Sequence, residues 1–200
     1  MPGTVTGSPD TAVLAVMLGL LHADAPEQIA GNPQAWPRWA VLLPHVLTAA
    51  GHAGHLPAKA QEAAGPDTAW LLDRAASYLR VHARLAEARP LAERALTITE
   101  AAYGPDHPIV ATELSNLALI LQDLGLTAEA RPLAERALTI DEAAYGPDHP
   151  DVAICLSNLA MILKDLGQGE LPGGQAKEEA ALRCCRHPRG NPQLTPRPVS

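Results

Sequence analysis

Residues 84–125 read RLAEARPLAERALTITEAAYGPDHPIVATELSNLALILQDLG, and residues 126–167 read LTAEARPLAERALTIDEAAYGPDHPDVAICLSNLAMILKDLG. The two stretches lie 42 residues apart and are identical at 34 of 42 positions. Chance does not produce such identity, which indicates a tandem duplication. A degenerate third copy lies upstream, because residues 67–83 fall one repeat before residues 109–125 and keep the same helical apolar spacing.

Each unit is predicted to form two helices, of which the first spans about 108–124. Pro108 suits the first helical position, Asp106 or His107 can cap the free amides before it, and Gly125 is typical of a left-handed residue that ends a helix. The apolar residues recur at i, i+3, i+4 and i+7 and form one stripe, made of Leu114, Leu117, Ala118 and Leu121.

The second helix of the unit is predicted from Thr127, as a cap, to about Tyr145. The linker at residues 146–150, GPDHP, then turns the chain into the next unit. His107 and His149 recur with this linker, which favours a structural role in turn and cap, and Tyr103 and Tyr145 are expected to pack at the ends of the second helices. The stripe of the second helix consists mostly of small residues: Ala130, Leu133, Ala134, Ala137, Leu138 and Ala144.

These units resemble a known family. The apolar positions of the first helix hold, in order, large, large, small and large residues, and those of the second helix hold small residues. This pattern is similar to that of a tetratricopeptide repeat. The 42-residue period, the LSNLA core at 114–118 and 156–160, the EARPLAERAL segment and the YGPDHP linker resemble the kinesin-light-chain-like subclass. The resemblance covers about 67–167 and implies an all-α, helix–turn–helix solenoid of about two and a half repeats. Residues 33–66 resemble the helical segment that precedes such repeats in bacterial NB-ARC signalling ATPases of the STAND class.

Residues 1–66 are predicted to be a helical capping segment for the N-terminal end of the solenoid. Asp10 can cap a helix that runs to about His22. Asn32 and Pro33 can start another, in which Pro37 and Pro44 are expected to kink or divide the chain. The apolar residues that this second helix carries are Trp36, Trp39, Leu42, Leu43, Val46 and Leu47.

Residues 168–200 depart from the repeat. After the first helix at 150–166, the chain gives GELPGG at 169–174 where EARPLAERAL is expected. Residues 175–185 are predicted to form a short helix, and residues 186–200, with four prolines, to be disordered. The loss of so regular a repeat suggests a truncation or a reading-frame change in the gene. It also leaves the apolar face of residues 150–166 partly uncovered, which predicts self-association through that segment.

Composition and charge exclude several classes of protein. The formal net charge of −7 argues against a nucleic-acid binder, which normally has a basic excess. No apolar run approaches the roughly 20 residues that cross a bilayer, so no membrane partner is expected. The first ten residues lack Lys and Arg, which argues against export. Three cysteines, Cys155, Cys184 and Cys185, make no disulfide framework and fit a reducing compartment, so we expect a cytoplasmic protein.

The sequence shows little that indicates catalysis. The dipeptide Gly-Lys never occurs, so no phosphate-binding loop of that kind is present. His52 and His55, or Cys184 and Cys185 with His187, could suggest a metal site of a hydrolase or redox protein, but zinc needs four placed ligands. We interpret the first pair as part of a loop and the second set as part of a C-terminal tail. We therefore expect no enzyme activity, no metal and no cofactor.

The functional surface is expected to be the concave face lined by the first helices of the units. The helical pattern places on it Trp70, Asp73, Ser77 and Arg80 in the first unit, Thr112, Ser115, Asn116, Leu119 and Gln122 in the second, and Ile154, Ser157, Asn158, Met161 and Lys164 in the third. Leu119, Ile154 and Met161 are the candidate apolar anchors.

The resemblance implies that Asn116 and Asn158 hydrogen-bond the backbone of an extended peptide, because an amide is both donor and acceptor. The alternative is that they bond only along their own helices or to water. The Lys/Asn clamp by which chaperone-binding relatives hold a carboxylate is not reproduced, since only Arg80 and Lys164 are basic in this set. The predicted function is a non-catalytic scaffold or sensor that binds a protein, as a peptide or helix. The alternative is a detached sensor region of a STAND-type ATPase whose nucleotide-binding domain is on another chain or was lost.

Overall fold

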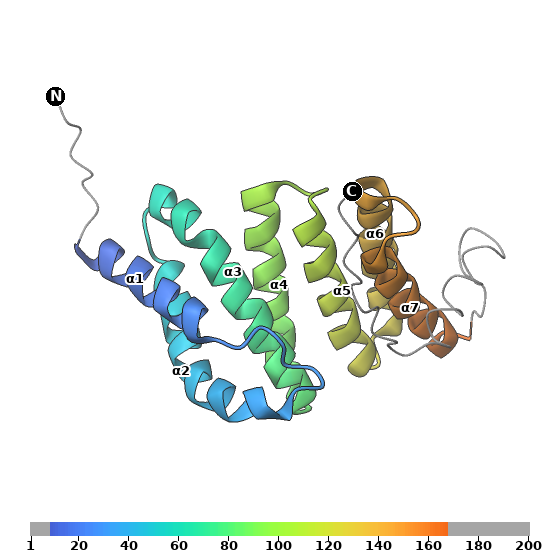
Figure 1. Cartoon of the computed structure of the whole chain (residues 1–200), viewed down its shortest axis with the longest axis horizontal. Helices are drawn as coiled ribbons and strands as arrows, with labels where there is room; N and C mark the ends of the chain where they lie inside the picture. The colour runs from blue at the N-terminus through green and yellow to red at the C-terminus, as the bar shows by residue number, and fades with distance from the viewer. Residues whose placement is uncertain (1–8, 168–200) are drawn as a thin grey trace, which may run out of the picture.

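The computed structural model describes residues 9–167, and within this range it is entirely helical. Figure 1 shows the helices side by side in chain order, which is the predicted helical solenoid. The all-α fold class is therefore confirmed. The elements are α1 (Pro9–Asp24), the short 3-10 helix η1 (Pro33–Ala35), α2 (Trp36–Ala53), α3 (Ala58–Val81), α4 (Leu85–Tyr103), α5 (Pro108–Asp123), α6 (Thr127–Tyr145) and α7 (Pro150–Asp165).

The helices of the repeats form two layers. The first helices of successive units are α3, α5 and α7, and the second helices are α4 and α6. The backbones of α3 and α5 approach each other, and so do those of α5 and α7, whereas α4 and α6 make no such approach. The first helices therefore form the inner, concave layer, and the second helices form the outer one.

The repeated linker builds the start and the end of the first helices. His107 precedes Pro108 and its Nδ1 accepts a hydrogen bond from the backbone N–H of Ile109 at 3.2 Å, so His107, rather than Asp106, caps α5. His149 does the same one repeat later. Gly125 ends α5 with φ of +77°, as predicted for a residue in the left-handed region.

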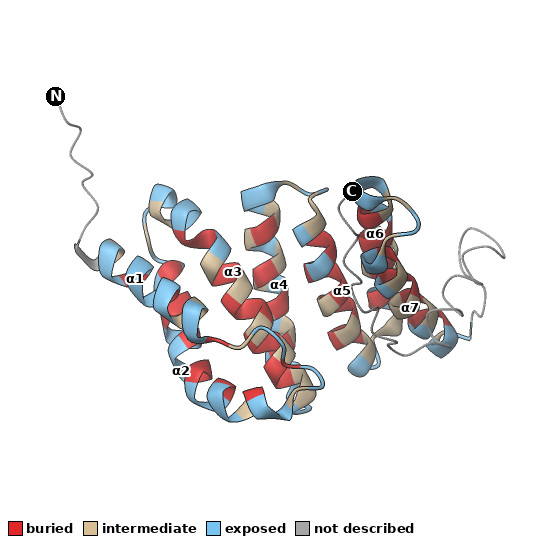
Figure 2. Cartoon of the chain, viewed as in Figure 1, coloured by how far each residue is buried: buried red, intermediate tan, exposed pale blue. Residues whose placement is uncertain are grey.

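Burial follows the predicted stripes closely (Figure 2). All four stripe residues of α5 are buried, and so are Ala130, Ala134, Ala137 and Leu138 of α6. The prediction for Ala144 is wrong, because the last turn of α6 lies beyond the stretch that its neighbours cover and is exposed. The cap assigned to Thr127 is also wrong, since Thr127 is the first residue of α6 and makes no capping bond.

Four prolines lie inside helices that remain continuous: Pro44 in α2, Pro66 in α3, Pro90 in α4 and Pro132 in α6. The helix is therefore not divided at Pro44, although division is one of the two outcomes expected there. Each of the four prolines is exposed, so water can reach the carbonyl that loses its partner in the preceding turn. Pro37 lies at the very start of α2, where a missing N–H removes no hydrogen bond.

The N-terminal segment packs against α3. Both α1 and α2 contact α3, and Asp10 lies within α1 rather than before it, so it does not cap that helix. α3 begins at Ala58, so the expected boundary between residues 66 and 67 falls inside one continuous helix. The structures predicted for residues 175–185 and 186–200 lie outside the described residues. None of the described helices is long and apolar enough to cross a membrane.

Candidate functional site

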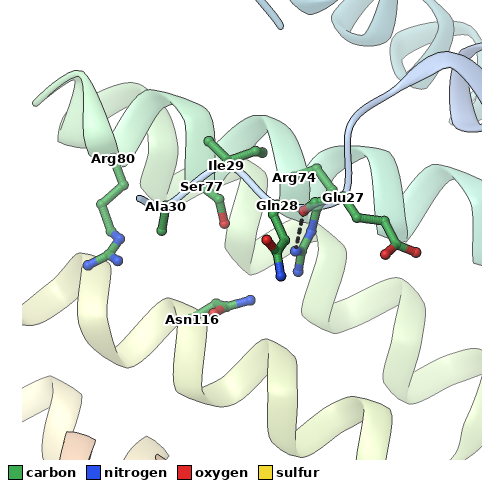
Figure 3. A pocket seen from close by; sticks show the side chains of 8 residues that line it. All are labelled: Glu27, Gln28, Ile29, Ala30, Arg74, Ser77, Arg80 and Asn116. Atoms are coloured by element: carbon green, nitrogen blue, oxygen red, sulfur yellow. Dashed lines mark hydrogen bonds between the residues drawn. The ribbon is translucent and has the colours of Figure 1, made fainter. Parts of the chain in front are cut away.

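The inner layer carries a polar recess of about 220 Å³ between α3 and α5. Figure 3 shows that one wall comes from the segment between α1 and η1, and that the others come from the two helices. The recess is lined by Glu27, Gln28, Ile29 and Ala30 of the connecting segment, Arg74, Ser77 and Arg80 of α3, and Asn116 of α5.

The segment at residues 25–32 is fixed by side chains that bind its backbone carbonyls. Trp39 Nε1 donates to the carbonyl of Pro26 at 3.0 Å, and Trp36 Nε1 donates to that of Ile29 at 3.1 Å. Arg74 Nη1 donates to the carbonyl of Glu27 at 3.1 Å, as Figure 3 shows. Ile29 itself is buried. The wall of the recess is therefore held from both α2 and α3.

A buried carboxylate orients two of the lining residues. Asp73 is 2% exposed, and its Oδ2 accepts hydrogen bonds from Arg74 Nε at 2.9 Å and Nη2 at 2.5 Å. Its Oδ1 accepts from Asn116 Nδ2 at 2.8 Å. Charge-assisted bonds of this kind are short and directional, so Asp73 fixes the guanidinium of Arg74 and the amide of Asn116 at the recess.

A second buried carboxyl lies next to Asp73. Burial first, and then the negative charge of Asp73, raise the pKa of Glu113 to about 10. Glu113 is thus protonated at pH 7, and its carboxyl is hydrogen-bonded with Asp73, while its Oε2 has no hydrogen-bond partner. The pair therefore carries one negative charge, which Arg74 balances.

The recess is polar without being strongly cationic. Arg80 Nη1 pairs with Asp123 Oδ2 at 3.1 Å, so both arginines of the recess have a carboxylate partner. A free carboxylate would compete with these partners for the guanidinium groups. Uncharged polar groups, such as the amides of a peptide backbone, can instead use the remaining donors and acceptors.

The structure brings together three of the predicted groove residues, Ser77, Arg80 and Asn116. Two others are not on the surface: Asp73 and Ser115 are buried, because their shared repeat position faces the next first helix rather than solvent. Of the rest, Thr112, Ile154, Met161 and Lys164 are exposed, and Trp70, Leu119, Gln122, Ser157 and Asn158 are half-buried.

Contacts restrict several of these half-buried residues. The ring of Trp70 stacks on His22 of α1, with the ring centroids 4.1 Å apart. Gln122 Nε2 donates to Asp165 Oδ2 at 2.6 Å, which links α5 to α7 on the inner layer. The hydroxyl of Ser157 donates to the carbonyl of Ala153 within its own helix.

The sequence analysis missed Arg74 and the segment at residues 27–30. The signal for Arg74 was present, because Arg74 and Asn116 are 42 residues apart and occupy the same repeat position. The sequence of the connecting segment did not indicate a place at the recess, because it has no periodic pattern. Its residue Glu27 contacts Arg74, which lies 47 residues later in the chain.

Ser115 belongs to a second buried polar row, between α5, α6 and α7. Its Oγ lies 3.4 Å from Cys155 Sγ, which donates to Asp141 Oδ2 at 3.2 Å. Burial is the main cause of two raised pKa values: the pKa of Cys155 is raised to about 12, and that of Asp141 is raised as well. Cys155 is therefore a protonated, buried thiol, which is the state of a structural cysteine rather than of a nucleophile.

The described residues contain no cluster of three or more metal-ligating side chains. His52 and His55 are both exposed at the end of α2 and just after it. The other candidate set, Cys184, Cys185 and His187, lies outside the part of the chain that the structure describes.

The fold defines a solenoid of helical hairpins, and comparisons with family models specify it further. Two models, both described as tetratricopeptide repeat, match residues 68–109 and 110–170, which together make up about half of the chain. The chain therefore belongs to the tetratricopeptide repeat proteins. The matches begin at residue 68, so the resemblance of residues 33–66 to STAND-class ATPases stays a prediction.

Solved structures share the fold. The crystal structure of BtubC (BKLC) from P. vanneervenii matches with a TM-score of 0.64 and 17% identity, over 98% of this chain and 74% of that chain. A putative kinesin light chain from Podosopora anserina, with nearly identical TPR-like repeats, matches with a TM-score of 0.62 and 17% identity, over 92% of this chain and 82% of that chain. The comparison with curated protein sequences found no match.

Proposed function

We propose that the chain is a non-catalytic interaction scaffold that binds a segment of another protein along the concave face of its repeats. Tetratricopeptide repeats commonly mediate protein–protein interaction, and the inner layer of α3, α5 and α7 offers the matching surface. The observation that carries the proposal is the convergence of Ser77, Arg80 and Asn116 with Arg74 in one polar recess.

The chemistry of the recess favours an extended peptide backbone as the bound group. Asp73 holds Arg74 and Asn116 in place before any ligand arrives, so little side-chain freedom is lost on binding. The carboxylate partners of Arg74 and Arg80 lower the attraction for an anionic ligand. Farther along the inner layer, the exposed side chains of Ile154 and Met161 supply apolar contacts for the same bound segment.

The test begins with peptides selected from a random display library against the full chain. Binding of a selected peptide is then titrated with wild type and with Ser77→Tyr, whose ring fills the recess. The matched control is Thr139→Tyr, which changes an exposed threonine on the outer helix α6, away from the concave face.

We expect Ser77→Tyr to raise Kd at least about tenfold and Thr139→Tyr to raise it less than about twofold, because steric exclusion from a pocket removes an anchor, whereas a change on the outer layer does not meet the bound segment. Circular dichroism of both variants checks that the fold is unchanged. Failure to select any peptide, or equal binding by wild type and Ser77→Tyr, contradicts the proposal.

A further inference from the structure

Helix α1 buries only one of its sides. Leu14 and Leu18 point into the core, whereas the opposite side is exposed along the edge of the molecule (Figure 2). Large apolar side chains form a ridge on that side: Val13 (59% exposed), Val16 (62%), Met17 (44%) and Leu20 (65%). Beside this α1 ridge runs a row of small exposed residues, Ala12, Ala15 and Gly19, which we call the small-residue row.

No polar side chain interrupts this face, because residues 12–21 read AVLAVMLGLL. Single exposed apolar residues are ordinary, but a contiguous apolar helix face at the end of a solenoid marks an interaction site. A partner that covers it must itself be apolar, since any charge it brought would be desolvated without a counter-charge.

We infer that the exposed face of α1 binds the same face of a second copy of this chain and forms a homodimer. The ridge and the small-residue row lie side by side on one helix, so the surface is self-complementary. A two-fold axis parallel to α1 places the ridge of each copy against the small-residue row of the other. A Cβ built on Gly19 meets no atom within 4 Å, which shows that the surface is open there.

Charge favours a second copy over a lipid surface. A membrane-binding helix normally flanks its apolar face with free Lys or Arg that meet anionic lipids. The charged groups at the C-terminal end of α1 are instead paired within the molecule, Asp24 with Arg38 and His22 with Asp67. The chain carries a net charge of −7, but none of that charge lies on residues 12–21, so like charges do not oppose contact there.

The test measures the sedimentation of the full chain over a wide range of concentrations. Wild type is expected to form a dimer, and Val16→Glu is expected to raise the dissociation constant about 100-fold or more, because two carboxylates would meet inside the apolar contact. Val41→Glu, at an exposed valine of α2, is the matched control and should leave the dimer intact. Ile154→Glu on α7 tests association through residues 150–166 instead.

Cross-linking provides a second readout that does not depend on a charged variant. Val16 lies at the middle of α1, so Val16→Cys in a Cys184→Ser/Cys185→Ser background is expected to give a disulfide-linked dimer under mild oxidation. Val41→Cys in the same background is expected to give none. A wild type that stays monomeric at all concentrations, or a dimer that Ile154→Glu disrupts and Val16→Glu does not, overturns the proposal.

Discussion

The two interfaces between successive first helices use the same repeat positions but different polar groups. Three buried positions recur one repeat apart. They hold Asp73, Thr99 and Glu113 on α3, α4 and α5, and Ser115, Asp141 and Cys155 on α5, α6 and α7. Two of these three positions are among the eight at which residues 84–125 and 126–167 differ. The two copies therefore differ at buried positions as well as at exposed ones.

The difference has a functional consequence. At the first interface, Asp73 reaches Arg74 and Asn116 and so organises the recess. At the second interface, Ser115 occupies the position of Asp73 and bonds inward to Cys155 instead. The same repeat position thus organises a polar site at one interface and makes an ordinary buried contact at the other.

The largest expected effect comes from the position that Asp73 and Ser115 share. Asp73→Ala is expected to lower the free energy of unfolding by about 3 kcal/mol, because it removes the partner of a charged and a polar group at once. Ser115→Ala is expected to cost only about 1 kcal/mol, the usual net value of one neutral hydrogen bond. Urea unfolding at pH 7 measures the loss of stability for both variants. Equal losses would contradict the difference between the two interfaces.

The pH dependence of stability should also distinguish the two interfaces. The pKa of Glu113 is raised to about 10 in the folded chain, so its contribution is full below its ordinary pKa and is lost as the pH rises toward 10. Between pH 6 and 9, wild type should therefore lose stability relative to Glu113→Gln, by at most about 1.4 kcal/mol per pH unit.

Cys155 occupies the equivalent position and provides the control for this experiment. Its thiol pKa is raised to about 12 in the folded chain, and an unfolded thiol ionises only at about pH 8.5. From pH 6 to about 7.5 the thiol is therefore protonated in both states, and the control is read in that range. Cys155→Ala should therefore leave the slope of stability against pH close to that of wild type. Parallel slopes for wild type and Glu113→Gln in denaturant titrations would show that Glu113 is ionised in the folded chain.

The smallest effect is expected where the copies are identical. His107 and His149 cap α5 and α7 in the same way, and each stacks on a tyrosine of the preceding helix, Tyr103 or Tyr145. His107→Ala and His149→Ala should each cost about 1 kcal/mol, the usual value of an N-cap. Thermal unfolding compares them, and a large difference would show that the capping histidines are not equivalent.

Much of the fold could be predicted because each repeat carries the residues that begin and end its helices. The apolar stripe of α5, the cap at His107 and the left-handed Gly125 depend on neighbours close in sequence. The division expected as one of two outcomes at Pro44 does not occur, because whether a proline ends a helix depends on whether water reaches the opened carbonyl. Sequence periodicity does not give that exposure.

The candidate site could be predicted only in part. Ser77, Arg80 and Asn116 follow from the helical pattern, since they lie on one face of their helices. The burial of Asp73 could not be predicted, because a charged residue is buried only when partners such as Arg74 and Asn116 reach it. The wall at residues 27–30 depends on contacts between distant segments, which a local sequence pattern does not indicate.

The central claim is that the recess at the first interface, and not its counterpart one repeat later, anchors the bound peptide. The most direct test titrates a display-selected peptide against Asn116→Ala and Asn158→Ala, which change the same repeat position. Loss of a preorganised hydrogen bond should weaken binding about fivefold for Asn116→Ala, within the range of one such bond, and less than about twofold for Asn158→Ala. Equal affinities for the two variants, or a larger loss for Asn158→Ala, would contradict the account.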